Sequence, residues 1–324
     1  MLQSADKVEM AAMPVAAVIG IDIAKHTMVL HDSISQHSWT IDNTYADALQ
    51  ALGPFAGHDL AVCEATGGYE RALLEAARTL NLPVHRADPA KAKAFIASHG
   101  GHAKTDKADA RWLARLGLER GASLTRWTPP DPEREALTAL VRYRQDLLKQ
   151  RTAAKNRRSA PTSGPVRDLL EAEIDFLDGQ ISRLDTRIDA LQTAPALVPI
   201  HRVLTQMTGV GAVGASSLIA LVPELGQINR RQIASLAGLA PHPRESGRFA
   251  GKRRTGGGRH ELRPILFMIA LSAARYCPKL NPFYDRLVSQ GKPKRVALTA
   301  VARKLLVIAN ARVRDANLAL PKLT

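Results

Sequence analysis

The sequence has few cysteines, few aromatic residues and no long apolar run. Its two cysteines, Cys63 and Cys277, form neither a disulfide framework nor a metal-binding spacing, which favours a reducing compartment. No apolar run reaches the ~20 residues that a membrane-spanning helix needs. The N-terminal segment also lacks the basic start and uninterrupted apolar block of a secretory signal. We therefore expect a cytoplasmic protein without a membrane partner.

Acidic residues are scarce relative to basic ones. The chain carries 45 Lys and Arg against 30 Asp and Glu, a formal net charge of +15. Such an excess favours polyanionic partners, because each phosphate that is neutralised releases condensed counterions. A merely soluble basic protein and a ribosome-associated protein remain alternatives. Membrane-surface binding is disfavoured, because no basic amphipathic helix with an aromatic apolar face is present.

The chain length of 324 residues predicts two or three domains. We expect a flexible tail over residues 1–14 and an α/β domain over residues 15–125. Three consecutive strand patterns (16–24, 27–33 and 37–43) are followed by a helix at 45–53. Strands at 59–65 and 83–88 then alternate with helices at 67–80, 89–100 and 107–116. This order predicts a mixed sheet covered by helices, with the first and fourth strands as neighbours.

Residues 126–198 show a wholly helical pattern. A heptad seam typical of a coiled coil recurs at steps of four and three through Leu170, Ile174, Leu177, Ile181, Leu184, Ile188 and Leu191. The preceding helix, 133–158, has a weaker seam through Leu137, Val141 and Leu148. The break SAPTSG between the two helices predicts an antiparallel hairpin. This region is either a helical spacer or a dimerisation arm.

Residues 199–324 predict a mainly helical C-terminal domain. Glycines at 209, 211 and 214 precede a helical segment, in a pattern similar to a helix-hairpin-helix turn, whose amides hold a DNA phosphate. Glycine-rich turns are common, so this signal alone is weak. A loop over residues 244–262 and helices over 263–276 and 295–313 complete the domain. Ser216 and Ser217 lie in apolar helical surroundings that favour packing or capping.

Four acidic residues lie at strand ends and at a helix start. Asp22 ends the first strand, Glu64 ends the fourth, and Asp106 and Asp109 share one face at the start of a helix. Acids that converge raise one another's pKa unless a cation lies between them. Oxygen ligands suit Mg²⁺ or Mn²⁺, which assist phosphoryl transfer. Any one of these acids alone is explained as a turn or helix cap, but the set of four predicts a metal site.

The segments GIDIAK, CEATGGYE and HAKTDKADARWLA resemble the three blocks of a RuvC-like nuclease domain with the ribonuclease H fold. Together with the C-terminal segments, they resemble the DEDD transposases of the IS-one-ten and IS-eleven-eleven insertion sequences, which include the Piv invertases. The resemblance covers nearly the whole chain beyond the first dozen residues. It identifies the DEDD tetrad, both catalytic and metal-binding, as Asp22, Glu64, Asp106 and Asp109.

The segment GLAPHPRESGRFAGKRR resembles the C-terminal block of that family, and the resemblance assigns the catalytic nucleophile to Ser246. From the residues alone, Ser246 is either a turn serine in a solvated loop or a nucleophile surrounded by cations. His242 and His260 flank the loop, which departs from the family pattern at GGGRHELR. The cations that we expect to bind nucleic acid are Arg244, Arg248, Lys252, Arg253, Arg254 and Arg259.

The resulting hypothesis is an insertion-sequence transposase, or site-specific recombinase, with a two-part active site. It cuts and rejoins DNA by metal-dependent phosphoryl transfer through a serine nucleophile. The resemblance also implies a structured guide RNA encoded by the element. We expect a bacterial protein that acts at the nucleoid, and a dimer or tetramer, because recombination must hold several DNA strands, element ends and target, together. Two alternatives remain: a Holliday-junction-type endonuclease that uses metal-activated water, and a non-catalytic nucleic-acid-binding scaffold.

Overall fold

A computed structural model describes residues 15–101, 105–246 and 249–319, and the side chains of all of these except 242–254 and 317–319. The chain divides into two compact units, residues 1–129 and residues 130–324. The helical hairpin and the C-terminal helices belong to the same second unit. None of the described helices combines the length and apolarity needed to cross a membrane.

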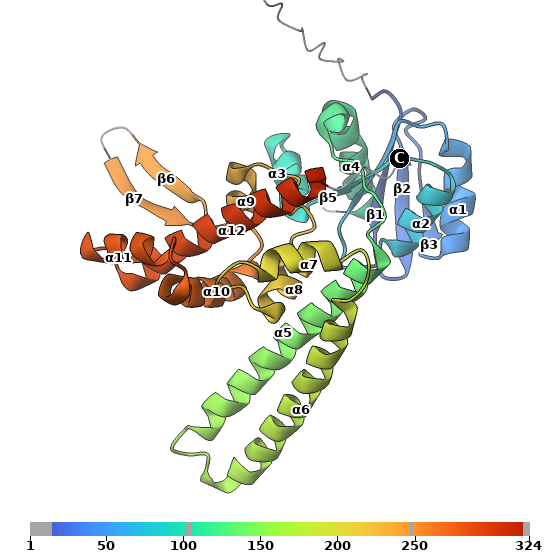
Figure 1. Cartoon of the computed structure of the whole chain (residues 1–324). Coiled ribbons are helices and arrows are strands. Elements are labelled where there is room, and N and C mark those ends of the chain that lie inside the picture. Colours follow the sequence, from blue (N-terminus) through green and yellow to red (C-terminus); the bar gives the residue numbers. More distant parts are fainter. Residues whose placement is uncertain (1–14, 102–104, 247–248, 320–324) are drawn as a thin grey trace, which may run out of the picture. The chain divides into compact units, whose positions relative to one another are not determined.

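The first unit contains the alternation of strands and helices that the sequence predicts (Figure 1). Helix boundaries follow local signals: Thr44, Asp88 and Thr105 accept backbone hydrogen bonds as N-caps of α1, α3 and α4. The elements are β1 (Val18–Ile23), β2 (Thr27–Asp32), β3 (Ser38–Asp42), α1 (Tyr45–Leu52), β4 (Leu60–Glu64), α2 (Arg71–Thr79), β5 (Val84–Ala87), α3 (Pro89–Ser98) and α4 (Asp106–Arg120), with short 3₁₀ turns at Gly53–Phe55 and Gly121–Ser123.

The five strands form one mixed sheet in the order β3-β2-β1-β4-β5. Strand β1 pairs antiparallel with β2 and parallel with β4, so the prediction that the first and fourth strands are neighbours is confirmed. One face packs against α1 and α2 through residues such as Ile19 and Ile21, and the other packs against α3 and α4 through Val18 and Val62. Cys63 is buried in the sheet and Cys277 is half-buried, and both are free.

The second unit is helical except for one β-hairpin. Its largest core lies among the helices that follow the long hairpin α5–α6, which projects from that core (Figure 1). The elements are α5 (Pro132–Arg158), α6 (Arg167–Leu191), α7 (Val198–Thr205), α8 (Ala212–Leu221), α9 (Arg230–Leu236), β6 (Pro241–Ser246), β7 (Phe249–Thr255), α10 (Leu262–Tyr276), α11 (Asn281–Ser289) and α12 (Lys294–Ala319), with a 3₁₀ turn at Gly164–Val166.

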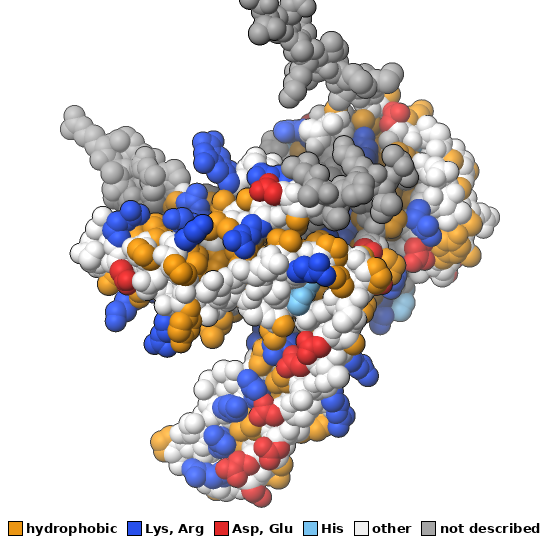
Figure 2. Space-filling view, viewed as in Figure 1, with side chains coloured by type: hydrophobic (Ala, Val, Ile, Leu, Met, Phe, Trp, Pro, Cys, Tyr) orange, Lys and Arg blue, Asp and Glu red, His pale blue; other side chains and the backbone are white. Residues whose placement is uncertain are grey.

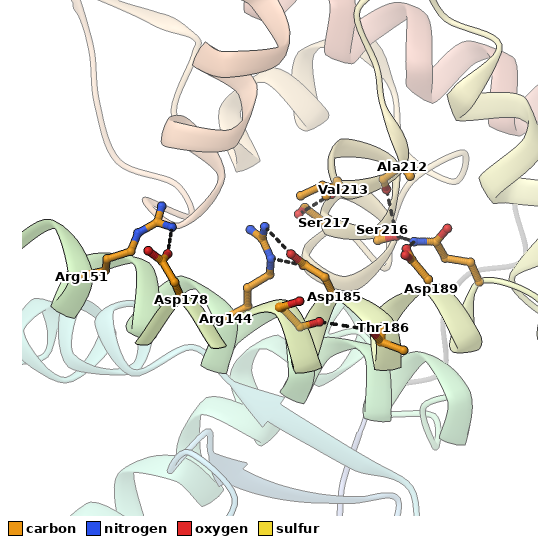
Figure 3. Close-up of polar contacts among 12 residues, drawn as sticks. Arg144, Arg151, Asp178, Asp185, Thr186, Asp189, Ala212, Val213, Ser216 and Ser217 are labelled. Carbon is orange, nitrogen blue, oxygen red and sulfur yellow. Dashed lines mark hydrogen bonds and ion pairs between the residues drawn. The ribbon is translucent and has the colours of Figure 1, made fainter. Parts of the chain in front are cut away.

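Helices α5 and α6 pack against each other within one chain, as the break between them predicts. The α6 seam is buried at Ile174, Leu177, Ile181, Leu184 and Ile188, whereas its two outermost positions are half-buried. On α5, Leu137 and Val141 are buried as predicted, and Leu148 is half-buried against the seam, where Leu147, which the pattern did not include, is buried. Ion pairs cross the hairpin from Arg144 to Asp185 and from Arg151 to Asp178 (Figure 3), and Lys155 also lies within 4.0 Å of Asp178.

One part of the C-terminal region differs from the sequence prediction, and another is present as predicted. Most of the segment predicted as a loop is the antiparallel hairpin β6–β7, and Ser246 pairs with Phe249 at its tip. Its charged sequence lacks the apolar alternation of a strand, so the local pattern does not indicate it. The glycine-rich turn is present between α7 and α8. Gly209 has a φ of 96° there, and a Cβ at this position would lie 2.7 Å from the backbone nitrogen of Ala273. Close packing on α10 explains this glycine.

Candidate functional site

Two strands bring Asp22 and Glu64 to neighbouring positions in the sheet. The parallel register pairs Ile21 of β1 with Cys63 of β4, and the two acids follow one residue later on each strand. Each acid is half-buried. Alternate residues of a strand point to the same face, so Asp22 lies on the face of Gly20, and Glu64 on that of Val62. Both acids therefore lie on the face that α4 covers.

The packing of α4 on that face sets the position of the other two acids. A Cβ on Gly20 would lie 2.0 Å from the backbone oxygen of Ala110, and a Cβ on Gly117 would lie 2.5 Å from Cγ1 of Val18. Helix α4 therefore runs antiparallel to β1, and its first turn lies at the Asp22 end of the strand. That turn carries Asp106, which is exposed, and Asp109, which is half-buried. The structure thus brings all four predicted acids to one face and one end of the sheet.

The donor set suits a hard cation, since all four side chains supply carboxylate oxygens. Within the described residues, however, no three His, Cys, Asp or Glu side chains lie close enough together to hold an ion. Asp22, Glu64 and Asp109 each have other polar interactions. The four residues suit Mg²⁺ or Mn²⁺ because all of them supply carboxylate oxygens and all lie on the same face of the sheet. That all four bind one metal site stays a prediction.

The loop after Glu64 is organised by Glu70, which the sequence analysis did not single out. The carboxylate of Glu70 is buried and accepts hydrogen bonds from the Thr66 hydroxyl at 2.7 Å and the Gly68 amide at 2.9 Å. It also pairs with Arg86, Nε to Oε1, at 2.9 Å. Burial alone would raise the pKa of Glu70, but these hydrogen bonds and Arg86 hold the pKa below its ordinary value. In the sequence, Glu70 is visible as the second glutamate of CEATGGYE, six residues after Glu64.

A pocket between β2 and α4 lies on the same face of the sheet. It has a volume of about 640 Å³, and its lining includes His31, Gln36, Arg111, Arg115 and Glu119. Arg115 pairs with Glu119 at 2.7 Å, so Arg111 supplies the net positive charge of the pocket. His31 is the β2 partner of Gly20, and burial, followed by the nearby Arg111, lowers its pKa. A smaller adjoining pocket is lined by Lys107. The sequence signal is the four-residue repeat of Lys107, Arg111 and Arg115 along α4.

In the second unit, Ser246 is the last residue of β6 and lies at the tip of the β6–β7 hairpin. The backbone of Arg244, Lys252, Arg253 and Arg254 belongs to the same hairpin, whereas their side chains, that of Ser246 and the whole of Arg248 lie outside the described residues. Their roles stay predictions. Arg259 pairs with Glu224 through two hydrogen bonds, at 2.8 and 2.6 Å, so any role in nucleic-acid binding would compete with this ion pair.

Ser216 and Ser217 are buried and hydrogen-bonded within α8, which confirms the expectation that they serve packing. The Ser216 hydroxyl donates to the Ala212 carbonyl at 3.0 Å and accepts from the Gln192 amide at 2.8 Å. The Ser217 hydroxyl donates to the Val213 carbonyl at 2.7 Å (Figure 3). Neither hydroxyl is available to solvent, so neither competes with Ser246 as a nucleophile.

Comparison with known proteins gives matches over most of the chain. A transposase family model, the DEDD transposase of IS110, matches residues 19–160, and a model described as "Transposase IS116/IS110/IS902 family" matches residues 201–285. The chain is 30% identical to the pilin gene-inverting protein of Moraxella lacunata over 92% of this chain and 95% of that protein. It is 32% identical to an uncharacterized 43.6 kDa protein of insertion element IS110 from Streptomyces coelicolor, over 45% of this chain and 36% of that protein.

Among solved structures, RuvC of Thermus thermophilus aligns with 35% of this chain and 100% of its own chain. The TM-score is 0.30 and the sequence identity is 17%.

Proposed function

The chain belongs to the IS116/IS110/IS902 family of transposases, and from this we propose that it cuts and rejoins DNA strands with two sets of groups, one on each unit. It is a DNA transposase or recombinase by family. The observation that best supports the finer proposal is the shared face of Asp22, Glu64, Asp106 and Asp109, which packing at Gly20 places at one end of β1.

In this proposal the four carboxylates hold divalent metal at the sheet end. Bound there, Mg²⁺ or Mn²⁺ would stabilise the charge that develops on phosphodiester oxygens during transfer. Glu70 keeps the loop after Glu64 in one conformation, so that the carboxylate of Glu64 stays at its strand end. The pocket between β2 and α4, which Arg111 and His31 line on the same face of the sheet, would accept a phosphate of the bound strand.

Ser246 would act as the nucleophile. Its hydroxyl oxygen bonds to the phosphorus of a phosphodiester, the bond from phosphorus to one sugar oxygen breaks, and that oxygen leaves as a hydroxyl after gaining a proton. The serine proton passes to a carboxylate of the first unit, which gives a proton to the departing sugar oxygen. The new ester bond to serine replaces the ester bond to the sugar that breaks, so attack by a sugar hydroxyl in the reverse direction rejoins a strand without an external energy source. The carboxylates and Ser246 belong to different units, so the two sets act together only on DNA that both units bind, from one protomer or two.

The family resemblance supports two further partners. A structured RNA encoded by the element would select donor and target DNA, and a dimer or tetramer would hold the strands together. Five basic residues close to Ser246 in the sequence would contact phosphate: Arg244, Lys252, Arg253 and Arg254, whose backbone belongs to the β6–β7 hairpin, and Arg248.

The test is formation of a covalent protein–DNA adduct. The full chain is incubated with element-end DNA, the element's RNA and Mg²⁺, and adducts are separated on denaturing gels. We expect adducts with the wild-type chain, and none with Ser246→Ala, with Asp22→Asn or in EDTA. DNA affinity should change little in Ser246→Ala, because one hydroxyl adds little to a cationic surface.

Ser217→Ala is a matched control, because it removes a serine hydroxyl that is buried within α8. It should form adducts at the wild-type level. Recombinant junctions formed at the normal rate by Ser246→Ala would refute the serine mechanism. Strand cleavage without adducts, in a metal-dependent reaction, would favour the alternative of hydrolysis by metal-activated water.

A further inference from the structure

The second unit contains a groove beside the base of the β6–β7 hairpin, formed by α9, α11 and α12. Its volume is about 840 Å³. Pro241 and Thr255, the first and last residues of the hairpin, form part of its lining. Helix α12 contributes one stripe, from Val296 to Val307, while the opposite side of the same helix is buried in the core. The groove is thus continuous with the hairpin that carries Ser246.

Among the residues whose side chains the structure describes, four basic residues and no acidic residue line this groove: Arg230 and Arg231 from α9, and Arg303 and Lys304 from α12. Within the part of the chain that the structure describes, none of the four forms an ion pair. This contrasts with the basic residues of the α5–α6 hairpin, several of which pair with acids of the facing helix. Lys and Arg side chains gather on the face around α9 and α12 (Figure 2). Neighbouring like charges repel, so such a cluster favours an anionic ligand.

An aromatic ring holds one of these cations in place. The Lys304 ammonium lies 4.4 Å from the centroid of the Phe283 ring, and the Arg286 guanidinium lies 5.5 Å from it. Phe283 is half-buried in the groove wall. Cation–π contacts of this kind restrict a flexible lysine without neutralising its charge. Lys304 therefore lies against the groove wall without an acidic partner among the described residues.

We propose that this groove binds the phosphodiester backbone of a nucleic-acid strand and leads that strand to the β6–β7 hairpin. A row of four basic side chains, with no acid among the described lining residues, suits a ligand that carries one negative charge per nucleotide along its length. Pro241 and Thr255 lie both in the groove lining and at the base of the hairpin, so a nucleic-acid strand that leaves the groove on this side continues along the hairpin. Delivery to Ser246 rests on the proposed function, whereas binding in the groove does not.

The experiment measures binding by fluorescence anisotropy with the full chain in EDTA, so that no chemistry occurs. The probes are a labelled 30-nucleotide single-stranded DNA, the same sequence as duplex DNA, and the same sequence as RNA, each titrated from 50 to 400 mM salt. The groove variant is Arg303→Gln with Lys304→Gln. The matched control is Arg312→Gln with Arg314→Gln, which removes two exposed arginines from the same helix outside the groove lining.

We expect the groove variant to bind its preferred probe about 15- to 30-fold more weakly at 150 mM salt. The slope of log affinity against log salt should become shallower by about 1.4 for a single strand or 1.8 for a duplex, as the loss of two phosphate contacts predicts. The control should change affinity less than twofold. Arg230→Gln with Arg231→Gln tests the opposite wall independently, should the α12 variant fold poorly. The probe that loses most affinity identifies the strand as DNA or RNA, and equal losses indicate recognition of the backbone alone.

A groove variant that binds all three probes as tightly as the control would overturn the proposal. So would competition by polyglutamate as effective as competition by nucleic acid, because the ligand would then be an acidic protein segment. Repeating the titration in the Ser246→Ala background separates the two proposals. If Ser246 is not the nucleophile, Ser246→Ala still forms protein–DNA adducts, whereas the groove variant still binds nucleic acid more weakly.

Discussion

Replacing Gly20 with alanine should separate α4 from β1 and disable the carboxylate site. An added Cβ would lie 2.0 Å from the Ala110 oxygen and 2.3 Å from the Ala114 nitrogen, whereas an ordinary contact begins at 3.4 Å. The helix must therefore move by about 1.4 Å, the difference between 3.4 and 2.0 Å. Both neighbours are backbone atoms of a helix and cannot rotate away. We expect a loss of about 3 kcal/mol in the free energy of unfolding, the upper end for overpacking.

The same shift moves Asp109, the residue before Ala110, away from Asp22. A displacement of about 1 Å at a catalytic group costs on the order of 100-fold in rate. Urea denaturation measures the stability, and single-turnover strand cleavage at a temperature where the variant is fully folded measures the rate. Gly57→Ala is the control, because a Cβ there meets no atom within 4 Å and the residue is exposed. If Gly20→Ala behaves like Gly57→Ala in both assays, α4 does not position the site as argued.

Two further predictions concern stability. Ile181→Glu places a charge in the α5–α6 seam, where Ile181 is 6% exposed, and should lower the free energy of unfolding by about 3 kcal/mol in urea denaturation. Phe176→Glu, at a position 65% exposed on the same helix, should lower it little. Equal losses in the two variants would contradict the buried seam. Glu70→Gln should lose about 1–3 kcal/mol at pH 7, because it removes a buried, hydrogen-bonded carboxylate. Since the folded-state pKa of Glu70 is lowered, its contribution is present above the ordinary Glu pKa of about 4.3 and is lost as the pH falls through the lowered value. The difference between wild type and variant should therefore shrink in denaturations at pH 5, 4 and 3, and a constant difference would refute the role of the charge.

Much of the fold follows from periodicity within single elements. Short apolar runs between polar turns located the strands of the sheet. Steps of three and four located the α6 seam, because burial on one side of a helix repeats with the period of that helix. The adjacency of Asp22 and Glu64 also followed from strand order, since a parallel neighbour places equivalent ends together. Short motifs were sufficient to identify the family.

Contacts between elements that lie far apart in the chain could not be obtained in this way. The pattern of α4 indicates a buried side but not its direction across β1, which depends on Gly20 meeting Ala110. The hairpin β6–β7 depends on pairing between two charged segments whose own patterns do not indicate strands.

By itself, the sequence determined the class of the elements in the first unit and of the long helices, the adjacency of the first and fourth strands, the family and the candidate acids, because these depend on local periodicity, on the order of elements and on residue type. Only the tertiary structure decided that all four acids lie on one face, that Glu70 organises the loop after Glu64, and that Arg259 pairs with Glu224 while four other cations line a groove without acids. These outcomes depend on packing between elements remote in sequence, since the partner of a charged side chain is set by which helices and strands meet.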